Sequence, residues 1–340
     1  MLYPSKLKNW LLPFFICIPL LVHARKTLQG PIGTQEDGPW FTGPLLTGSG
    51  HVIPPGHANY EPYFYWTHEP GRYNKHWHVV KTPPTFKSLL TQIGMQFGIL
   101  PATEFDIAPQ FLYNNHGGQH MWRVSDMPVF LGFQLLRDRP GKWWPAIKLR
   151  IGAVLPLGKY DKLNPSKLFT DAGGLGDWAP NLALITVKSY HFGGFQYLVW
   201  RMSFGYAMTV PISVHGLSSW GGSPSLPGLK GTRGTVYPGC LFNALQGFEY
   251  SLTRNWVLAL DIQYLHINRT RFSGRSPTIL GRSTKPVAPS AEQFNLAPAI
   301  EYNFNAHVGI ITGPWFSIAG RNHNQTGKFF SWVFALNIYQ

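Results

Sequence analysis

The chain has 340 residues, of which 44% are hydrophobic, 15% aromatic and only 13% charged. A soluble domain usually has about 25% charged residues, so this composition argues against an ordinary soluble protein. The formal net charge of +14 makes nucleic acid the first partner to consider. The basic residues, however, form no helical stripe or dense cluster. Because a scattered basic surface fits anionic lipid headgroups or lipopolysaccharide phosphates equally well, we predict those partners and no nucleic acid.

The start of the chain predicts a secretory signal peptide, residues 1–24. Two lysines give a positive n-region, residues 10–22 form an apolar h-region, and the small residue Ala24 stands at the cleavage position. The alternative is an uncleaved N-terminal anchor. After cleavage the chain keeps a single cysteine, Cys240, so the fold cannot depend on an internal disulfide bond.

Residues 25–56 form a segment rich in Gly and Pro, which rules out a regular helix or a central strand. A leader left in the periplasm would expose an apolar patch, which soluble surfaces usually avoid. The apolar side chains in question are Trp40, Phe41, Leu45, Leu46, Val52 and Ile53. We therefore predict a plug folded inside a pore, with an extended, disordered or partner-bound leader as the alternative.

Residues 57–340 contain no run of about eighteen apolar residues, which excludes a bundle of transmembrane helices. They contain instead stretches of about ten residues in which apolar and polar side chains alternate, the length that a tilted strand needs to cross a bilayer. The predicted strands are His57–Thr67, Leu89–Leu100, Glu104–Asn114, Met127–Arg137, Ala146–Leu157, Asn181–Tyr190, Tyr197–Pro211, the two strands of the Phe248–His266 hairpin, Gln293–Phe304, His307–Phe316 and Phe329–Gln340. About twelve strands is an even number, as bacterial single-chain barrels require.

The Phe248–His266 hairpin shows the alternation most completely. In its second half every second residue from Trp256 to Tyr264 is apolar or aromatic, while the residues between them include Asp261 and Gln263. Successive side chains of a strand point to opposite faces, so one face is suited to lipid and the other to a lumen. The hairpin therefore predicts an all-β fold, an up-and-down transmembrane antiparallel β-barrel.

The connections between these strands alternate in length. Every second one is short, and the others are longer and richer in Gly, Pro and charge, as in barrels with short periplasmic turns and long outer loops. Polar, His-rich loops are expected at residues 68–84 and 115–126. The long loops Gly158–Ala179 and Arg269–Ser290 are predicted to face the outside. A soluble β-sandwich would not need this regularity.

Three segments resemble a known family of outer-membrane transporters, the one grouped as MetA-pathway of phenol degradation. They are Met127–Gly158, the G-G-L-G-D-W motif at 173–178 and the stretch F-E-Y-S-L-T-R-N-W-V-L-A-L-D at 248–261. The resemblance covers most of the mature chain, and it implies a barrel that takes up small, apolar or aromatic, molecules. One departure is that the chain ends in Gln340 rather than in the aromatic residue that the barrel assembly machinery reads in many such proteins.

Charged residues collect on the parity that faces the lumen, because charges on the lipid face are costly. The predicted pore-lining residues are Glu61, Glu104, Asp106, Lys148, Arg150, Arg201, Glu249, Asp261 and Glu301. One interpretation is a transverse electric field that orients polar or charged solutes at a constriction. The other is a set of ion pairs that only fill and stiffen the barrel.

Other candidate chemistry is weak, and we predict neither a metal site nor a cofactor. The loop histidines, among them His76, His78 and His116, lack fixed acidic or Cys partners. Serines lie on strands, but no strand histidine matches their depth and no G-x-S-x-G motif occurs. We therefore predict a non-enzymatic uptake pore in the outer membrane of a Gram-negative bacterium, with lipid, lipopolysaccharide, a small solute and the barrel assembly machinery as partners. The alternatives are a barrel enzyme that hydrolyses lipid or peptide, and an adhesin or structural barrel that acts through its loops.

Overall fold

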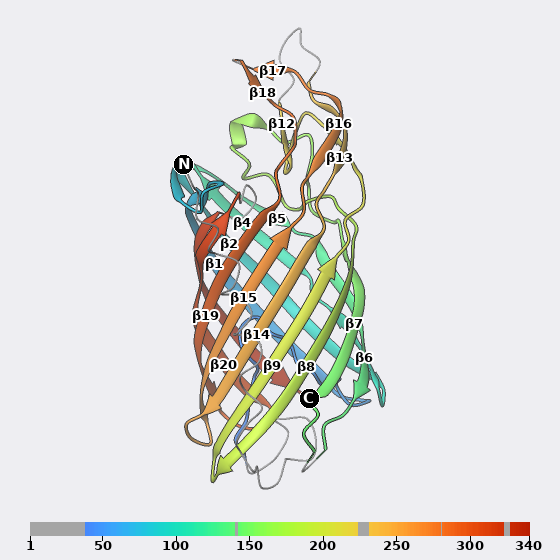
Figure 1. Ribbon diagram of the computed structural model, residues 1–340, viewed down its shortest axis with the longest axis vertical. Helices are drawn as coiled ribbons and strands as arrows, with labels where there is room; N and C mark the ends of the chain where they lie inside the picture. Colours follow the sequence, from blue (N-terminus) through green and yellow to red (C-terminus); the bar gives the residue numbers. More distant parts are fainter. Residues whose placement is uncertain (1–37, 140–141, 224–230, 280, 323–326) are drawn as a thin grey trace, which may run out of the picture.

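The chain forms a closed antiparallel β-barrel in the computed structural model, which describes residues 38–139, 142–223, 231–279, 281–322 and 327–340 (Figure 1). The wall strands are β1 (Ala58–Tyr73), β2 (Val79–Leu100), β3 (Thr103–Ile107), β4 (Gln110–His116), β5 (Gln119–Val124), β6 (Met127–Leu136), β7 (Ala146–Leu155), β8 (Ala179–Gly193), β9 (Gln196–Ala207), β14 (Leu241–Ser251), β15 (Trp256–Ile267), β19 (Ala291–Asn303), β20 (Val308–Arg321) and β21 (Lys328–Tyr339). The sheet closes because β1 pairs with both β2 and β21. The predicted signal peptide lies outside the described residues.

The barrel wall consists of twelve strands, as predicted. β3 and β4 together form one of them, and β5 and β6 together form another. The predicted strand Glu104–Asn114 is thus two strands, interrupted at Ala108 and Pro109. Proline has no N–H to give to the ladder, and Pro128 faces this break across the sheet, where its carbonyl accepts the N–H of Ala108 at 3.0 Å.

Two predicted loops are wrong, because residues 68–84 and 115–126 belong mainly to paired strands. β1 and β2 remain paired as far as Tyr73 and Val79. The turn between them is held by Asn74, whose Oδ1 accepts the N–H groups of His76 and His78 at 2.8 and 3.1 Å. In the second loop, β5 pairs with β4.

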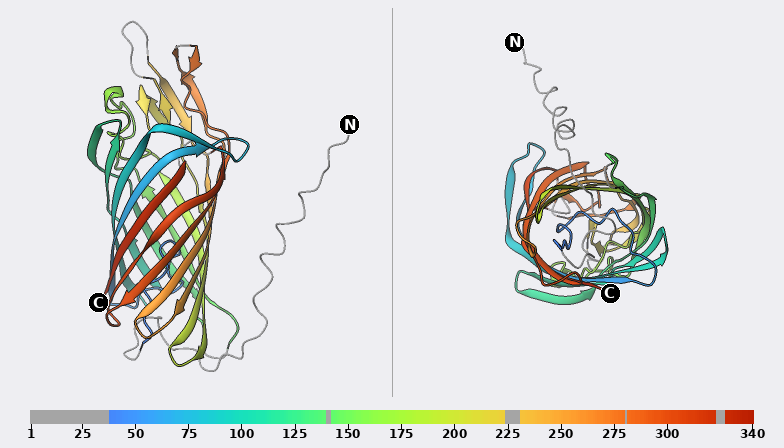
Figure 2. Two further views of the ribbon diagram at one scale, coloured as in Figure 1. Left: turned by 90° about the vertical axis from the view of Figure 1, so that its left-hand side faces the viewer. Right: turned by 90° about the horizontal axis from the view of Figure 1, so that it is seen from below.

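The long loops contain small sheets of their own, which stand above the barrel rim (Figure 1). A three-stranded sheet consists of β10 (Ile212–His215), β13 (Arg233–Tyr237) and β16 (Arg271–Arg275). The shorter elements are β11 (Leu217–Ser218) with β12 (Gly221–Gly222), β17 (Thr278–Ile279) with β18 (Arg282–Ser283), and the 3₁₀ helix η2 (Pro165–Lys167). We call this end of the barrel the long-loop end. The opposite short-turn end carries the turn at residues 194–195 and the C-terminus (Figures 1 and 2).

The outer face of the barrel is apolar around its circumference. On β15 the exposed fractions of Trp256 and Leu258 are 43% and 46%, while Val257 and Asp261 are fully buried. The same alternation leaves large apolar side chains exposed on other wall strands, among them Phe64, Trp66, Leu131, Ile151, Leu182, Ile300, Ile318, Phe330, Trp332 and Phe334. An apolar surface of this extent marks a lipid-facing band. No helix in the described part of the chain is long and apolar enough to span a membrane.

Candidate functional site

Residues 38–56, which we call the luminal segment, lie within the ring of strands; the right-hand view of Figure 2 shows this stretch in blue inside the barrel. Two apolar side chains hold it against the wall. Phe41 packs in a buried cluster with Val187, Val199 and other wall residues. Leu45 packs with a second cluster of small and branched side chains from four wall strands: Ala259, Ala297, Ile311, Val333 and Ala335.

The backbone of the luminal segment follows no sheet ladder, so its N–H groups need other acceptors. Wall carboxylates supply several of them. Glu301 accepts the N–H of Thr42 at 3.0 Å, and Glu249 accepts the N–H of Gly43 at 3.1 Å. Asp261 accepts three hydrogen bonds, from the N–H groups of Leu46 and Thr47 and, at 2.5 Å, from the Thr47 hydroxyl.

Arg201 of β9 completes this first group. Its Nε lies 2.6 Å from Glu249 Oε2, and both side chains are almost fully buried. Gly247 lies on β14, between β9 and β15, and leaves room for the luminal segment beside these carboxylates. A Cβ at this position would lie 2.9 to 3.0 Å from Pro44, Thr47 and Asp261. A larger residue at this position would push the luminal segment off its acceptors.

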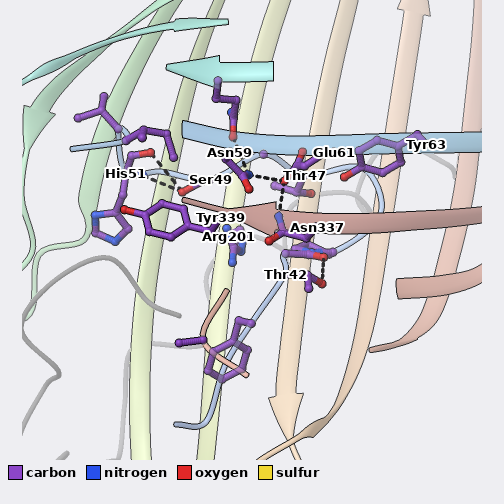
Figure 3. A pocket seen from close by; sticks show the side chains of 18 residues that line it. Thr42, Thr47, Ser49, His51, Asn59, Glu61, Tyr63, Arg201, Asn337 and Tyr339 are labelled. Atoms are coloured by element: carbon purple, nitrogen blue, oxygen red, sulfur yellow. Dashed lines mark hydrogen bonds between the residues drawn. The ribbon is translucent and has the colours of Figure 1, made fainter. Parts of the chain in front are cut away.

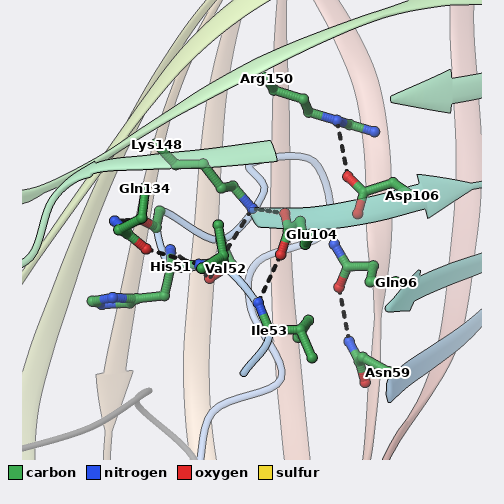
Figure 4. Close-up of polar contacts among 12 residues, drawn as sticks. His51, Val52, Ile53, Asn59, Gln96, Glu104, Asp106, Gln134, Lys148 and Arg150 are labelled. Carbon is green, nitrogen blue, oxygen red and sulfur yellow. Dashed lines mark hydrogen bonds and ion pairs between the residues drawn. The ribbon is translucent and has the colours of Figure 1, made fainter. Parts of the chain in front are cut away.

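A second group of wall residues holds the later part of the luminal segment (Figure 4). Glu104 accepts the N–H of Ile53 at 2.8 Å, and Lys148 Nζ lies 2.6 Å from the other oxygen of the same carboxylate. Gln134 accepts the N–H of Val52 at 2.9 Å. Gly132 leaves the space for the ion pair, since a Cβ there would come within 2.7 Å of the Glu104 side chain.

The remaining predicted residues also lie inside the barrel. Arg150 Nε is 3.2 Å from Asp106 Oδ2, and the guanidinium lies 3.8 Å from the centre of the Phe130 ring. Glu61 accepts hydrogen bonds from Asn59 and Asn337, both at 2.9 Å. The structure thus places all nine predicted charged residues on the inner face.

Four of the six carboxylates bind the luminal segment directly, and two of the three cations are paired with those carboxylates. The sequence did not predict that the charged residues bind the luminal segment. It also did not predict Gln134, which lies on the inner face of β6 and whose amide also donates to Gly50 O at 2.9 Å. A polar amide side chain at a lumen-facing position of the predicted strand was the available signal.

A cavity of about 140 Å³ remains between the luminal segment and the wall (Figure 3). Its lining is largely polar and includes Thr42, Ser49, Glu61, Arg201 and Asn337, with Tyr63 at one side. This volume is close to that of cavities that accept a benzene-sized molecule, but the polar lining favours water in the absence of a solute.

Above the luminal segment, the lumen wall combines amides with aromatic rings. Asn295 donates to Gln263 at 2.8 Å, and Gln263 donates to Asn243 at 3.2 Å, which gives a polar band across three strands. On the strands that follow next around the wall, β20, β21 and β1, aromatic rings contact one another. Tyr63 stacks on Tyr65 at 5.7 Å between ring centres, Tyr65 meets Trp315 edge-on at 6.3 Å, and Trp315 meets Phe329 at 4.8 Å.

Among the residues that the structure describes, no group of three His, Cys, Asp or Glu side chains could hold a metal ion. His116 lies instead with its two ring nitrogens 3.1 and 3.0 Å from the carbonyl oxygens of Leu168 and Pro84.

No protein-family model matches the sequence, and neither does any curated protein. Among solved structures, the COG4313 outer membrane channel from Pseudomonas putida F1 is similar at 12% sequence identity, with a TM-score of 0.63 over 87% of this chain and 100% of that chain. The NanC porin has 7% identity and a TM-score of 0.41 over 82% of this chain and 98% of its own. A deltaS2 mutant of the TodX monoaromatic hydrocarbon channel has 9% identity and a TM-score of 0.37, covering 84% and 90%. The likeness to the Pseudomonas channel is one of fold: the chain is a twelve-stranded barrel of the outer-membrane kind.

Proposed function

We propose that this protein is an outer-membrane channel that takes up small solutes, apolar or aromatic ones among them, and that the luminal segment is its plug. The observation that carries the proposal is the way the lumen is filled. Residues 38–56 are held by side chains of the wall rather than by a sheet ladder, and a cavity remains beside them. A segment bound in this way can leave without breaking a strand pairing of the wall.

The charged residues act in this proposal as the attachment points of the plug. Glu104, Glu249, Asp261 and Glu301 accept its N–H groups, while Lys148 and Arg201 compensate two of these buried carboxylates. This role is closer to the ion-pair interpretation than to a transverse field. The pairs do more than stiffen the wall, however, because they orient the acceptors toward the segment.

The solute class rests on two supports. The sequence resembles transporters of the MetA-pathway of phenol degradation family in the segments 127–158, 173–178 and 248–261. The ring contacts from Tyr63 to Phe329 offer aromatic faces along one side of the lumen, on which planar solutes can stack.

The proposed location is the outer membrane of a Gram-negative bacterium, reached after cleavage behind Ala24. The apolar outer face requires lipid, insertion requires the barrel assembly machinery, and the outer leaflet makes lipopolysaccharide a neighbour. The protein transports and does not hydrolyse its solute.

Deletion of Gly38–Pro55 behind an intact signal peptide tests the proposal. In planar bilayers the deletion variant should show a higher single-channel conductance than the full chain, and it should pass a panel of small aromatic solutes faster in liposome swelling. Folding is checked by heat-modifiable migration in gels. Unchanged conductance in a correctly folded deletion variant would remove the plug and leave a plain channel. Hydrolysis of lipid or peptide by the full chain would favour a barrel enzyme instead.

A further inference from the structure

The three-stranded sheet β10–β13–β16 has one apolar face and one polar face. Ile212, Val214 and Val236 are buried and pack with Tyr160, Trp220 and Phe272. Since residues directly opposite one another in a sheet share a face, the register also fixes which side chains lie on the other side.

The polar face consists of three cross-strand rows. The row farthest from the wall strands joins His215, Arg233 and Arg275, and the next joins Ser213, Thr235 and Ser273. In the row nearest the wall, Tyr237 lies opposite Arg271. We call these eight residues the basic face. Its three arginines are exposed.

Arg233 and Arg275 are direct cross-strand neighbours, and like charges in this position repel. Residues 208–240 and 268–290, which form this part of the loops, carry seven Lys or Arg and no Asp or Glu. Among the described residues, no ion pair joins a carboxylate to the three arginines of the face. One acidic group lies at its corner, where Asp161 Oδ2 is 3.4 Å from His215 Nδ1. The repulsion is relieved when an anion lies between the arginines.

The spacing of the rows indicates what kind of anion fits. Arg271 and Arg275 are four residues apart on one strand, which is about 13 Å along the strand. A ligand with two separated anionic groups can therefore pair with both positions while each arginine side chain stays extended over its own row. Guanidinium groups bind phosphate through paired hydrogen bonds, and the hydroxyl row between them suits sugar hydroxyls.

We propose that the basic face binds the phosphorylated inner core of lipopolysaccharide. The assignment rests on the proposed outer-membrane location, which puts the long-loop end among the headgroups of the outer leaflet (Figure 1). It goes beyond that proposal by naming a site. The face holds a polyanionic glycolipid beside the channel mouth, outside the lumen.

The test compares two double variants of equal charge loss, in the full chain purified in detergent. Arg233→Gln with Arg275→Gln alters the basic face, whereas Arg282→Gln with Lys285→Gln alters exposed cations of the same loops on or beside β17–β18. The probe is purified lipopolysaccharide with a phosphorylated inner core, beside the same material after phosphatase treatment. The wild-type chain should bind the phosphorylated form at least about tenfold more tightly. The first double variant should lose this preference, and the second should keep it within about threefold.

Equal losses in the two double variants would mean diffuse charge attraction and would overturn the site. Displacement by inorganic phosphate, or equally tight binding of phosphatidylglycerol vesicles through the same arginines, would assign a general anion site and overturn the lipopolysaccharide assignment. Conductance separates this inference from the proposed channel function. The Arg233→Gln, Arg275→Gln chain should conduct like wild type, and a wild-type chain without conductance would count only against the channel.

Discussion

At Asp261 a single carboxylate accepts hydrogen bonds from the backbone of two successive residues of the luminal segment and from the Thr47 hydroxyl. Its side chain is fully buried, and so is Thr47, which supplies two of the three donors. A buried donor that loses its acceptor costs about 1–3 kcal/mol. Removal of this one carboxylate is therefore expected to weaken the hold on the segment more than removal of a neighbouring lumen residue that does not touch it.

Asp261→Ala should raise the open probability or the conductance of the channel toward that of the deletion variant, because Leu46 and Thr47 lose their acceptor. Gln263→Ala is the matched control, since this residue lies two positions along the same face and its amide contacts Asn243 and Asn295 instead. Both variants are recorded in planar bilayers under identical salt. Equal conductance of Asp261→Ala and wild type would argue that this carboxylate does not retain the segment.

On the scale of one element, the side chains of β15 alternate between an outer face suited to lipid and an inner face that lines the lumen. Leu258 and Ile262 are exposed on the outer face, whereas Ala259, Asp261 and Gln263 are buried on the inner one. β14 and β19 hold β15 in register along its whole length, so the strand cannot slip by one residue to accommodate a misplaced charge.

Leu260→Arg should prevent stable insertion, because an arginine near the midplane of the lipid face costs about 2–4 kcal/mol. Gln263→Arg should still insert, although it gives up two amide hydrogen bonds worth about 1 kcal/mol each. The measurement is the heat-modifiable fraction recovered in the outer-membrane fraction. If the two variants insert equally well, the outer and inner faces of this strand have been assigned wrongly.

At the scale of the whole molecule, the two ends of the barrel differ. The long-loop end carries additional sheets and the 3₁₀ helix, while the short-turn end carries tight turns and the C-terminus (Figure 2). Long loops of outer-membrane barrels face the outside of the cell, so we expect the basic loops there.

A cysteine introduced at Ser276, in a Cys240→Ser background, should react with a membrane-impermeant reagent on intact cells. A cysteine at Ala102, in the exposed turn between β2 and β3, should react only after permeabilisation of the outer membrane. The reverse pattern would invert the topology.

The sequence predicted the wall strands where lipid lies on one side and the lumen on the other, because those two environments impose the alternation. It failed beyond the lipid band. The upper parts of β1 and β2, and the strands β5, β10, β13 and β16, are short or interrupted stretches rich in Gly, Pro, His and other polar residues, which resembled loops. The nine charged residues were recognisable from parity alone. The hydrogen bonds of four of them, Glu104, Glu249, Asp261 and Glu301, were not, since these bind backbone amides of an irregular segment far away in the chain.

This separation along the chain determines when the luminal segment can bind to the wall. Thr42 and its acceptor Glu301 are 259 residues apart in the chain, and the other acceptors come from β3, β6, β14 and β15. Contacts between such remote residues form late, because both sides must first be brought together. During biogenesis the luminal segment must therefore wait until nearly the last strand is in position. Until then the nascent barrel has an unoccupied interior, whose carboxylates are solvated by water.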